Sequence, residues 1–203
     1  MTSSPKPAPR VIFPILIIIA LAIGALFLIK AELGPRPAND LGGEQAADSG
    51  SVAIGATIPD FSLTSLQGKS AKFSEITRAA RAKVVLVNFW ATWCGACMDE
   101  MPSLVRLRET YRSKGFEILG INLDENPAAV VPRAEKELDI RFPVFSDSEG
   151  KLADYFDVHA IPLSVIIETQ GAKRKILYIE NGERNWNDRE IRQKLDHWLN
   201  RMK

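Results

Sequence analysis

The chain has 203 residues, a hydrophobic fraction of 46% and a formal net charge of +1 at pH 7. This length suits one well-buried domain with an attached segment and is too short for two ordinary domains. The 26 basic and 25 acidic side chains are interleaved without a basic cluster, which argues against a nucleic-acid or polyanion binder.

An uninterrupted apolar run extends from Val11 to Ile29. Its length is close to the roughly 20 residues that a helix needs to cross a bilayer. A cleaved signal peptide is the alternative, but its apolar region would be about 7 to 15 residues long and would end at a small-residue cleavage site. We therefore expect residues 11–29 to form a single transmembrane anchor after an N-terminal segment of residues 1–10.

The charges on either side of this run predict its orientation. They are Lys6, Arg10 and the terminal amine before the run, and Lys30 and Arg36 after it. By the positive-inside rule, this margin of one charge favours a cytoplasmic N-terminus and an extracytoplasmic C-terminal domain. In a bacterium, the anchor would lie in the inner membrane and the domain in the periplasm. Residues 30–50 are poor in large apolar side chains, so we expect them to form a flexible linker.

Beyond the linker, the spacing of apolar residues predicts an α/β domain over residues 51–203. We first expect a hairpin over 59–66 and 72–76 that covers one end of a sheet, a strand over 84–90, a helix over 95–112 and a strand over 116–123. A helix over 127–138 follows, capped by Asn126 and either kinked or shortened by Pro132, then a strand over 142–145 and a short helix over 151–156. Antiparallel strands over 163–168 and 175–180 and a helix with a capping box at Asn187 and Glu190 complete the domain. This order predicts a central mixed sheet flanked by helices.

The two cysteines of the chain, Cys94 and Cys97, follow the run Val84–Trp90 at the start of the next predicted helix. A loop this short adds little stability, so a disulfide here is a chemical device. The helix dipole stabilises the thiolate of Cys94, which we expect to attack a partner's disulfide before Cys97 resolves the mixed disulfide. A metal half-site and inert thiols are the alternatives. A structural zinc site needs four ligands, and the chain has only two cysteines and two histidines, so we expect no metal and no cofactor.

The stretch VNFWATWCGACMDEMP, from Val87 to Pro102, resembles the thioredoxin superfamily. Within it, the chain from residue 54 to 203 is similar to the membrane-anchored TlpA and ResA type of thiol-disulfide oxidoreductases. IPDFSLTSLQGK resembles their N-terminal hairpin, and FPVFSDSEGKLADYFDVHAIP resembles their central insertion and active-site loop.

This resemblance implies a thioredoxin-like fold in which Trp93 is exposed beside the disulfide. It also implies a cis peptide bond between Ile161 and Pro162, in a loop that guides a partner's backbone. From the sequence alone, an ordinary trans proline remains open for Pro162.

Two further side chains are candidates for modifying the cysteine chemistry. Asn88 stands where thioredoxin has a buried acid, and the resemblance to ResA-like proteins places an active-site glutamate at Glu100. Our hypothesis is that Glu100 is partly buried with a raised pKa and moves protons to or from the cysteines, the alternative being a solvated carboxylate. His159 departs from the family pattern. Facing Cys94, it would stabilise the thiolate, but an exposed loop histidine is favoured.

Three functions remain open. We expect a dithiol reductase that keeps extracytoplasmic partner proteins reduced, such as apocytochrome c as the resemblance implies, and that draws electrons from a membrane donor. A disulfide donor or isomerase is the second, because the Gly-Ala dipeptide between the cysteines does not decide the direction. The third is a copper chaperone that uses Cys94, Cys97 and His159. A peroxiredoxin is disfavoured, because the chain has no Thr-x-x-Cys motif.

Overall fold

The computed structural model describes residues 52–170 and 174–202. The expected cytoplasmic segment, anchor and linker, over residues 1–10, 11–29 and 30–50, lie outside the described residues. Within the described ranges, no helix combines the length and the apolar character that crossing a membrane requires.

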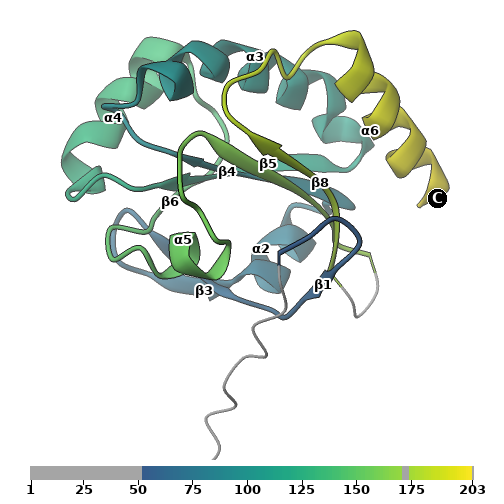
Figure 1. The fold of residues 1–203 in the computed structure, drawn as a ribbon, viewed down its shortest axis with the longest axis horizontal. Coiled ribbons are helices and arrows are strands. Elements are labelled where there is room, and N and C mark those ends of the chain that lie inside the picture. The colour runs from purple at the N-terminus through teal and green to yellow at the C-terminus, as the bar shows by residue number, and fades with distance from the viewer. Residues whose placement is uncertain (1–51, 171–173, 203) are drawn as a thin grey trace, which may run out of the picture. The chain divides into compact units, whose positions relative to one another are not determined.

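Eight strands of the described residues form one mixed sheet (Figure 1). The strands are β1 Thr57–Ile58, β2 Ser62–Ser65, β3 Ser70–Lys72, β4 Val84–Trp90, β5 Phe116–Asn122, β6 Val144–Ser146, β7 Leu163–Glu168 and β8 Arg174–Asn181. Their order across the sheet is β1-β8-β7-β4-β5-β6-β2-β3. Strand β4 pairs in parallel with β5 and antiparallel with β7. This central position explains why every residue of β4 is buried, as its apolar run predicts.

Helices cover both faces of the sheet, which confirms the predicted α/β architecture (Figure 1). The helical segments are α2 Phe73–Ala79, α3 Gly95–Tyr111, the 3-10 turn η1 Arg112–Lys114, α4 Pro127–Leu138, α5 Lys151–Tyr155 and α6 Arg189–Arg201. Alternate side chains of β4 point to opposite faces. Leu86 and Trp90 pack in the core with α3, α4 and α6, whereas Val87 and Phe89 pack in the core with α2 and α5. The sheet therefore separates two apolar cores.

The predicted hairpin is present, but its second arm is shorter than expected. Strands β2 and β3 pair antiparallel, and β2 joins the sheet edge at β6 instead of covering one end of the sheet. The expected strand over 72–76 is wrong, because helix α2 begins at Phe73. Two capping bonds explain this start: the backbone N–H of Lys72 donates to Glu75 Oε2 at 3.0 Å, and that of Ser74 donates to Asp60 Oδ1 at 3.1 Å.

Two other boundaries differ from the prediction, whereas helix α4 spans the predicted residues Pro127–Leu138. Helix α6 is capped by Asp188, whose Oδ1 accepts from the backbone N–H of Ile191 at 2.8 Å, so the expected capping box at Asn187 is wrong. Helix α4 begins at Pro127 and continues through Pro132, so the late start did not occur. Strand β6 begins at Val144, two residues later than expected.

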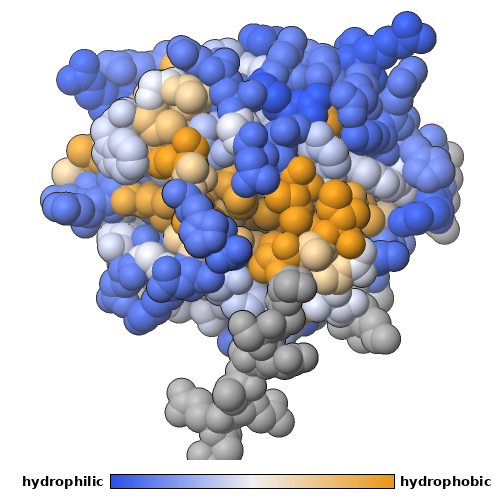
Figure 2. Space-filling model, viewed as in Figure 1, coloured by the Kyte–Doolittle hydropathy of each residue, from blue (hydrophilic) through white to orange (hydrophobic). Residues whose placement is uncertain are grey.

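Apolar side chains reach the surface at one edge of the sheet. On the side of the molecule that Figure 2 shows, they gather near the middle, over the region where β8 and β1 lie in Figure 1. Ile54, which precedes β1, is exposed, and Leu177 and Ile179 of β8 are only partly buried. Hydrophilic residues cover much of the rest of this face, so the β8 edge is its most apolar part.

A buried ion pair links α3 to β5. The guanidinium of Arg108 donates from Nε to Glu117 Oε1 and, at 3.0 Å, from Nη2 to Glu117 Oε2. Oε1 also accepts from the backbone N–H of Ile118 at 2.9 Å. Because both charges are out of water, each depends on the other for compensation.

We expect the Arg108→Leu variant to lose about 3–5 kcal/mol of unfolding free energy, because the Glu117 carboxylate is left buried without its partner. Urea unfolding of the oxidised protein measures this loss. The matched control is Arg133→Leu, which breaks an exposed 2.7 Å pair with Glu137 and should cost about 0.5 kcal/mol or less. Equal small losses would show that another cation, such as Arg112 at 4.0 Å, compensates Glu117.

Candidate functional site

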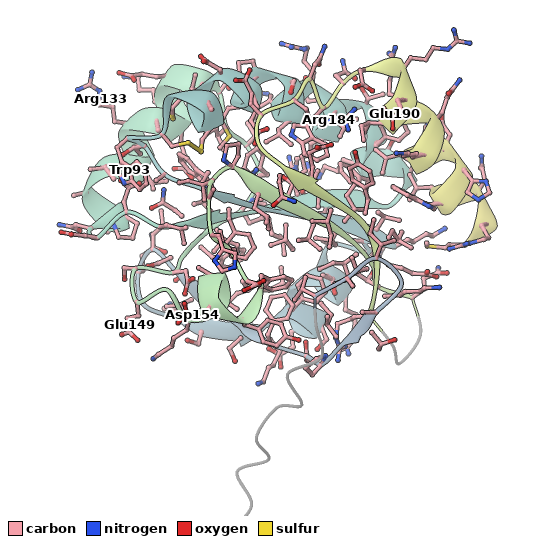
Figure 3. The ribbon with its side chains drawn as sticks, viewed as in Figure 1. Trp93, Arg133, Glu149, Asp154, Arg184 and Glu190 are labelled. Atoms are coloured by element: carbon pink, nitrogen blue, oxygen red, sulfur yellow. A yellow bond between two sulfur atoms is a disulfide. The ribbon has the colours of Figure 1, made fainter. Side chains whose placement is uncertain are left out.

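The two cysteines form a disulfide at the start of α3, which follows β4 in the chain. Cys94 is the N-cap residue of α3, and Cys97 lies in its first turn, with 5.2 Å between the two Cα atoms. Figure 3 shows the disulfide as a yellow bond on the same side of the domain as the labelled Trp93. Cys94 is 8% exposed and Cys97 is fully buried. A partner's sulfur can therefore approach Cys94 but not Cys97.

The start of α3 surrounds Cys94 with a favourable environment for negative charge. The backbone N–H of Cys97 donates to Cys94 Sγ at 3.2 Å. The free N–H groups of a helix N-terminus and the helix dipole both stabilise an anion at this position. Reduction of the disulfide therefore leaves the Cys94 sulfur where its thiolate form, the reactive nucleophile, is favoured.

The loop before β7 lies against the disulfide. The peptide bond between Ile161 and Pro162 is cis, as the family resemblance implies. The carbonyl oxygen of Ile161 is 3.7 Å from Cys94 Sγ. The carbonyl of Pro162 accepts from the backbone N–H of Gly182 at 2.8 Å, which ties the loop to the end of β8. Ile161 and Pro162 thus lie next to the Cys94 sulfur, in a loop that is tied to the end of β8.

Trp93 projects from the turn that connects β4 to Cys94, and it is 70% exposed. This turn is held by Asp124, a buried acid just beyond β5. The Asp124 carboxylate accepts from the backbone N–H of Thr92 at 2.9 Å and from the Thr92 hydroxyl at 2.8 Å. Asp124 was not among the residues predicted from the sequence, although an acid just after a strand parallel to β4 could have indicated it.

Glu100 lies in the core one helical turn after Cys97 and is 1% exposed. Three groups donate to its carboxylate. Asn88 Nδ2 donates to Oε1 at 2.8 Å, and Trp186 Nε1 donates to Oε2 at 2.9 Å. The backbone N–H of Arg184 is 3.4 Å from Oε2. The Glu100 side chain is therefore buried, and the alternative from the sequence, a solvated carboxylate, is wrong.

Burial raises the pKa of Glu100 from 4.5 to about 7, because the charged form loses its hydration. The hydrogen bonds from Trp186, Asn88 and Arg184 lower this pKa and only partly offset the effect of burial, while the charge of Glu183 raises it further. A carboxyl group in this range exchanges its proton near neutral pH, which suits acid–base chemistry at the neighbouring thiols.

Trp186 was also missed, although a tryptophan between Asn185 and Asn187 in a polar turn is an unusual residue to find there. Its backbone N–H donates to Ser103 Oγ at 2.9 Å, and its buried side chain bonds Glu100. The guanidinium of Arg184 lies 5.5 Å from the Trp186 ring centroid. The turn between β8 and α6 therefore closes over the carboxylate.

The structure does not bring His159 to the cysteines. Its side chain is 84% exposed, and Nε2 lies 3.0 Å from Asp157 Oδ1. In the described ranges, no three His, Cys, Asp or Glu side chains are grouped closely enough to hold a metal ion. This geometry gives no support to copper binding by Cys94, Cys97 and His159.

A thioredoxin-like α/β fold with a Cys-x-x-Cys disulfide at a helix N-terminus beside a cis-proline loop defines a thiol-disulfide oxidoreductase. Residues 54–176 match the AhpC/TSA family, so the chain belongs to this family.

Individual relatives agree with this class. The chain is 35% identical over 126 residues to the thiol-disulfide oxidoreductase ResA of Geobacillus kaustophilus, which covers 62% of this chain and 70% of that relative. It is 32% identical over 152 residues to ResA of Geobacillus thermodenitrificans, covering 75% and 82% of the two chains. Among solved structures, the thiol:disulfide interchange protein DsbE of Chlorobium tepidum has a TM-score of 0.62 and 28% identity, covering 73% of this chain and 99% of its own.

Proposed function

We propose that this oxidoreductase works as a reductase that keeps the cysteines of extracytoplasmic partner proteins reduced. The observation that carries this direction is the buried Glu100, one helical turn from Cys97. The negative charge of a carboxylate one helical turn away disfavours the thiolate forms of the cysteines. It therefore destabilises the reduced pair relative to the disulfide, which makes the pair a stronger reductant. The dipeptide Gly95–Ala96 carries no charge, and His159 is paired with Asp157 instead of supporting a thiolate.

The reaction moves two electrons and two protons. The Cys94 thiolate attacks one sulfur of a partner's disulfide, forming a mixed disulfide and releasing the other partner sulfur as a thiolate. Cys97 then loses its proton, for which ionised Glu100 is the acceptor, and attacks Cys94 Sγ. As the Cys94–Cys97 disulfide closes, the second partner sulfur also leaves as a thiolate. The two partner thiolates take up two protons from solvent and become a dithiol. These balance the proton that Cys94 released when it ionised and the proton that Glu100 took from Cys97 and passes to solvent. A dithiol donor at the membrane must then reduce the pair again.

The partner contacts follow from the same geometry. Trp93 is exposed immediately before Cys94, and the carbonyl oxygen of Ile161 lies 3.7 Å from Cys94 Sγ. We assign them to the binding of the partner's chain around its disulfide. Apocytochrome c is the candidate substrate that the resemblance to the TlpA and ResA type implies.

We also propose that residues 11–29 anchor the protein in the inner membrane as a single span, with residues 51–203 in the periplasm. The apolar run and the charges around it support this topology. Intact spheroplasts expose only the outer face of this membrane. Protease added to them should therefore digest residues 51–203. Digestion only after membrane lysis would place the domain in the cytoplasm.

The reduction potential of the Cys94–Cys97 pair tests the direction. The full chain in detergent micelles is equilibrated with defined thiol and disulfide mixtures, and the reduced fraction is counted after alkylation. We expect a value near thioredoxin's, roughly −270 mV. A value near that of DsbA, roughly −120 mV, would overturn the reductase function and identify a disulfide donor.

A further inference from the structure

The side-chain amide of Asn88 is buried between Glu100 and Ser164. Its Nδ2 donates to Glu100 Oε1 at 2.8 Å and to Ser164 Oγ at 3.0 Å, so both amide hydrogens are used. Its Oδ1 is equally buried and has no hydrogen-bond partner among the described residues. A buried amide oxygen without a donor is costly, and it needs a physical reason.

The present arrangement suits only the ionised form of Glu100. A proton on Oε1 would face the N–H groups of Asn88, which cannot accept it. A proton on Oε2 would face the indole N–H of Trp186 and the backbone N–H of Arg184, which are also donors. Protonated Glu100 therefore needs an acceptor, and the unpartnered Asn88 Oδ1 is the one within reach of a side-chain rotation.

We infer that the side-chain amide of Asn88 rotates about its Cβ–Cγ bond, exchanging the positions of Oδ1 and Nδ2, each time Glu100 gains or loses its proton. Asn88 is thus a positioning residue for proton transfer. In the rotated form, Oδ1 accepts from the Oε1–H of protonated Glu100 and from the hydroxyl of Ser164. One amide thus offers an N–H to the carboxylate form and a lone pair to the acid form, and its second N–H or lone pair goes to Ser164. This inference rests on the proposed proton exchange between Glu100 and the cysteines.

The other groups around Glu100 cannot take this role. Trp186 and the backbone of Arg184 are donors only. The Arg184 guanidinium is held by Glu180 and Asp188, each at 2.6 Å, and Glu183 contributes only its charge. On α3 itself, Cys97 lies one turn earlier and is the thiol that exchanges the proton. Because the pKa of Glu100 is about 7, both protonation states are populated at neutral pH.

Nuclear magnetic resonance of the oxidised full chain in detergent micelles tests the rotation. The Glu100 carboxyl carbon and the Asn88 side-chain amide are followed from about pH 5 to about pH 9. We expect both to change with the same midpoint. The nuclear Overhauser contacts from the Asn88 amide hydrogens to Ser164 and Glu100 should be present above the midpoint and lost below it.

Asn122 is the matched control amide. Its Nδ2 donates to Asp124 Oδ2 at 2.8 Å, and its Oδ1 accepts from the Asp124 backbone N–H at 3.1 Å. Both of its polar atoms are satisfied in one orientation, so its contacts should stay constant over the same pH range.

The Glu100→Gln variant provides a second test. A glutamine carries a permanent N–H₂ group, and with its oxygen toward the Trp186 indole that group must face Asn88. We expect the Asn88 amide of this variant to show the rotated contacts at every pH, matching the wild-type protein at low pH. Contacts that stay unchanged while Glu100 titrates, or a Glu100 that stays ionised throughout, would overturn the inference.

The two proposals can fail separately. A reduction potential near −120 mV with an intact amide rotation would refute the reductase function and leave the positioning role of Asn88 in place. A static amide in a protein with a potential near −270 mV would do the reverse.

Discussion

We expect the Cys94→Ser variant to lose disulfide exchange by more than about 10³-fold, because it removes the nucleophile. Cys97 cannot replace it, since the Cys97 side chain is fully buried and a partner's sulfur cannot approach it. The measurement is the initial rate at which the reduced protein reduces a disulfide-bonded model protein, compared with buffer alone.

The Cys97→Ser variant is the matched partner of this experiment. Its Cys94 can still attack, but nothing resolves the product, so a covalent mixed disulfide with the substrate should accumulate. Mass spectrometry detects this adduct, which a reducing agent should release. An adduct on Cys94→Ser and none on Cys97→Ser would reverse the roles of the two sulfurs.

The second large effect is on the pH dependence of stability. A native pKa of about 7 against 4.5 in the unfolded chain means that the folded protein binds the Glu100 proton more tightly. The contribution of this proton to the free energy of unfolding is fully present below about pH 4.5 and is lost as the pH rises through about 7. At 1.36 kcal/mol per pKa unit, this loss amounts to about 3 kcal/mol. The Glu100→Gln variant has no proton to lose, so it should gain about that much stability relative to wild type between these pH values.

Urea unfolding of the oxidised proteins at about pH 4.5 and about pH 8 measures this difference. Glu109→Gln, at an exposed position of the same helix, is the control and should follow the wild-type pH dependence. If Glu100→Gln also follows wild type, Glu100 is ionised in the folded protein across this range, and it has no proton to give.

The parts of the fold that depend on local pattern were predictable from the sequence. The apolar run of β4 and the helical spacing of α3 place Cys94 at a helix N-terminus with no knowledge of the rest of the chain. The prediction for the second arm of the hairpin failed at helix α2, whose start is fixed by two capping bonds. One is local, from Lys72 to Glu75, but the other joins Ser74 to Asp60, fourteen positions away, and no local pattern reports it.

The environment of Glu100 shows the same limit more strongly. The family resemblance indicated the residue, but its donors could not be found by spacing. Trp186 is 86 positions away, and Ser164, which bonds Asn88, is 76 positions from that asparagine. Only the packing of α3 against β4, and the closure of the turn between β8 and α6, bring these side chains together.

This difference in sequence distance has a consequence for the newly made chain. The disulfide joins residues only three positions apart, so it can close as soon as the segment containing Cys94 and Cys97 has been made. The partners of Glu100 meet only after the strands around β4 and the C-terminal turn have assembled. A chain that has not yet assembled can therefore exchange disulfides before Glu100 is buried among its hydrogen-bond partners. Exchange that depends on the Glu100 proton is therefore expected only in the assembled domain.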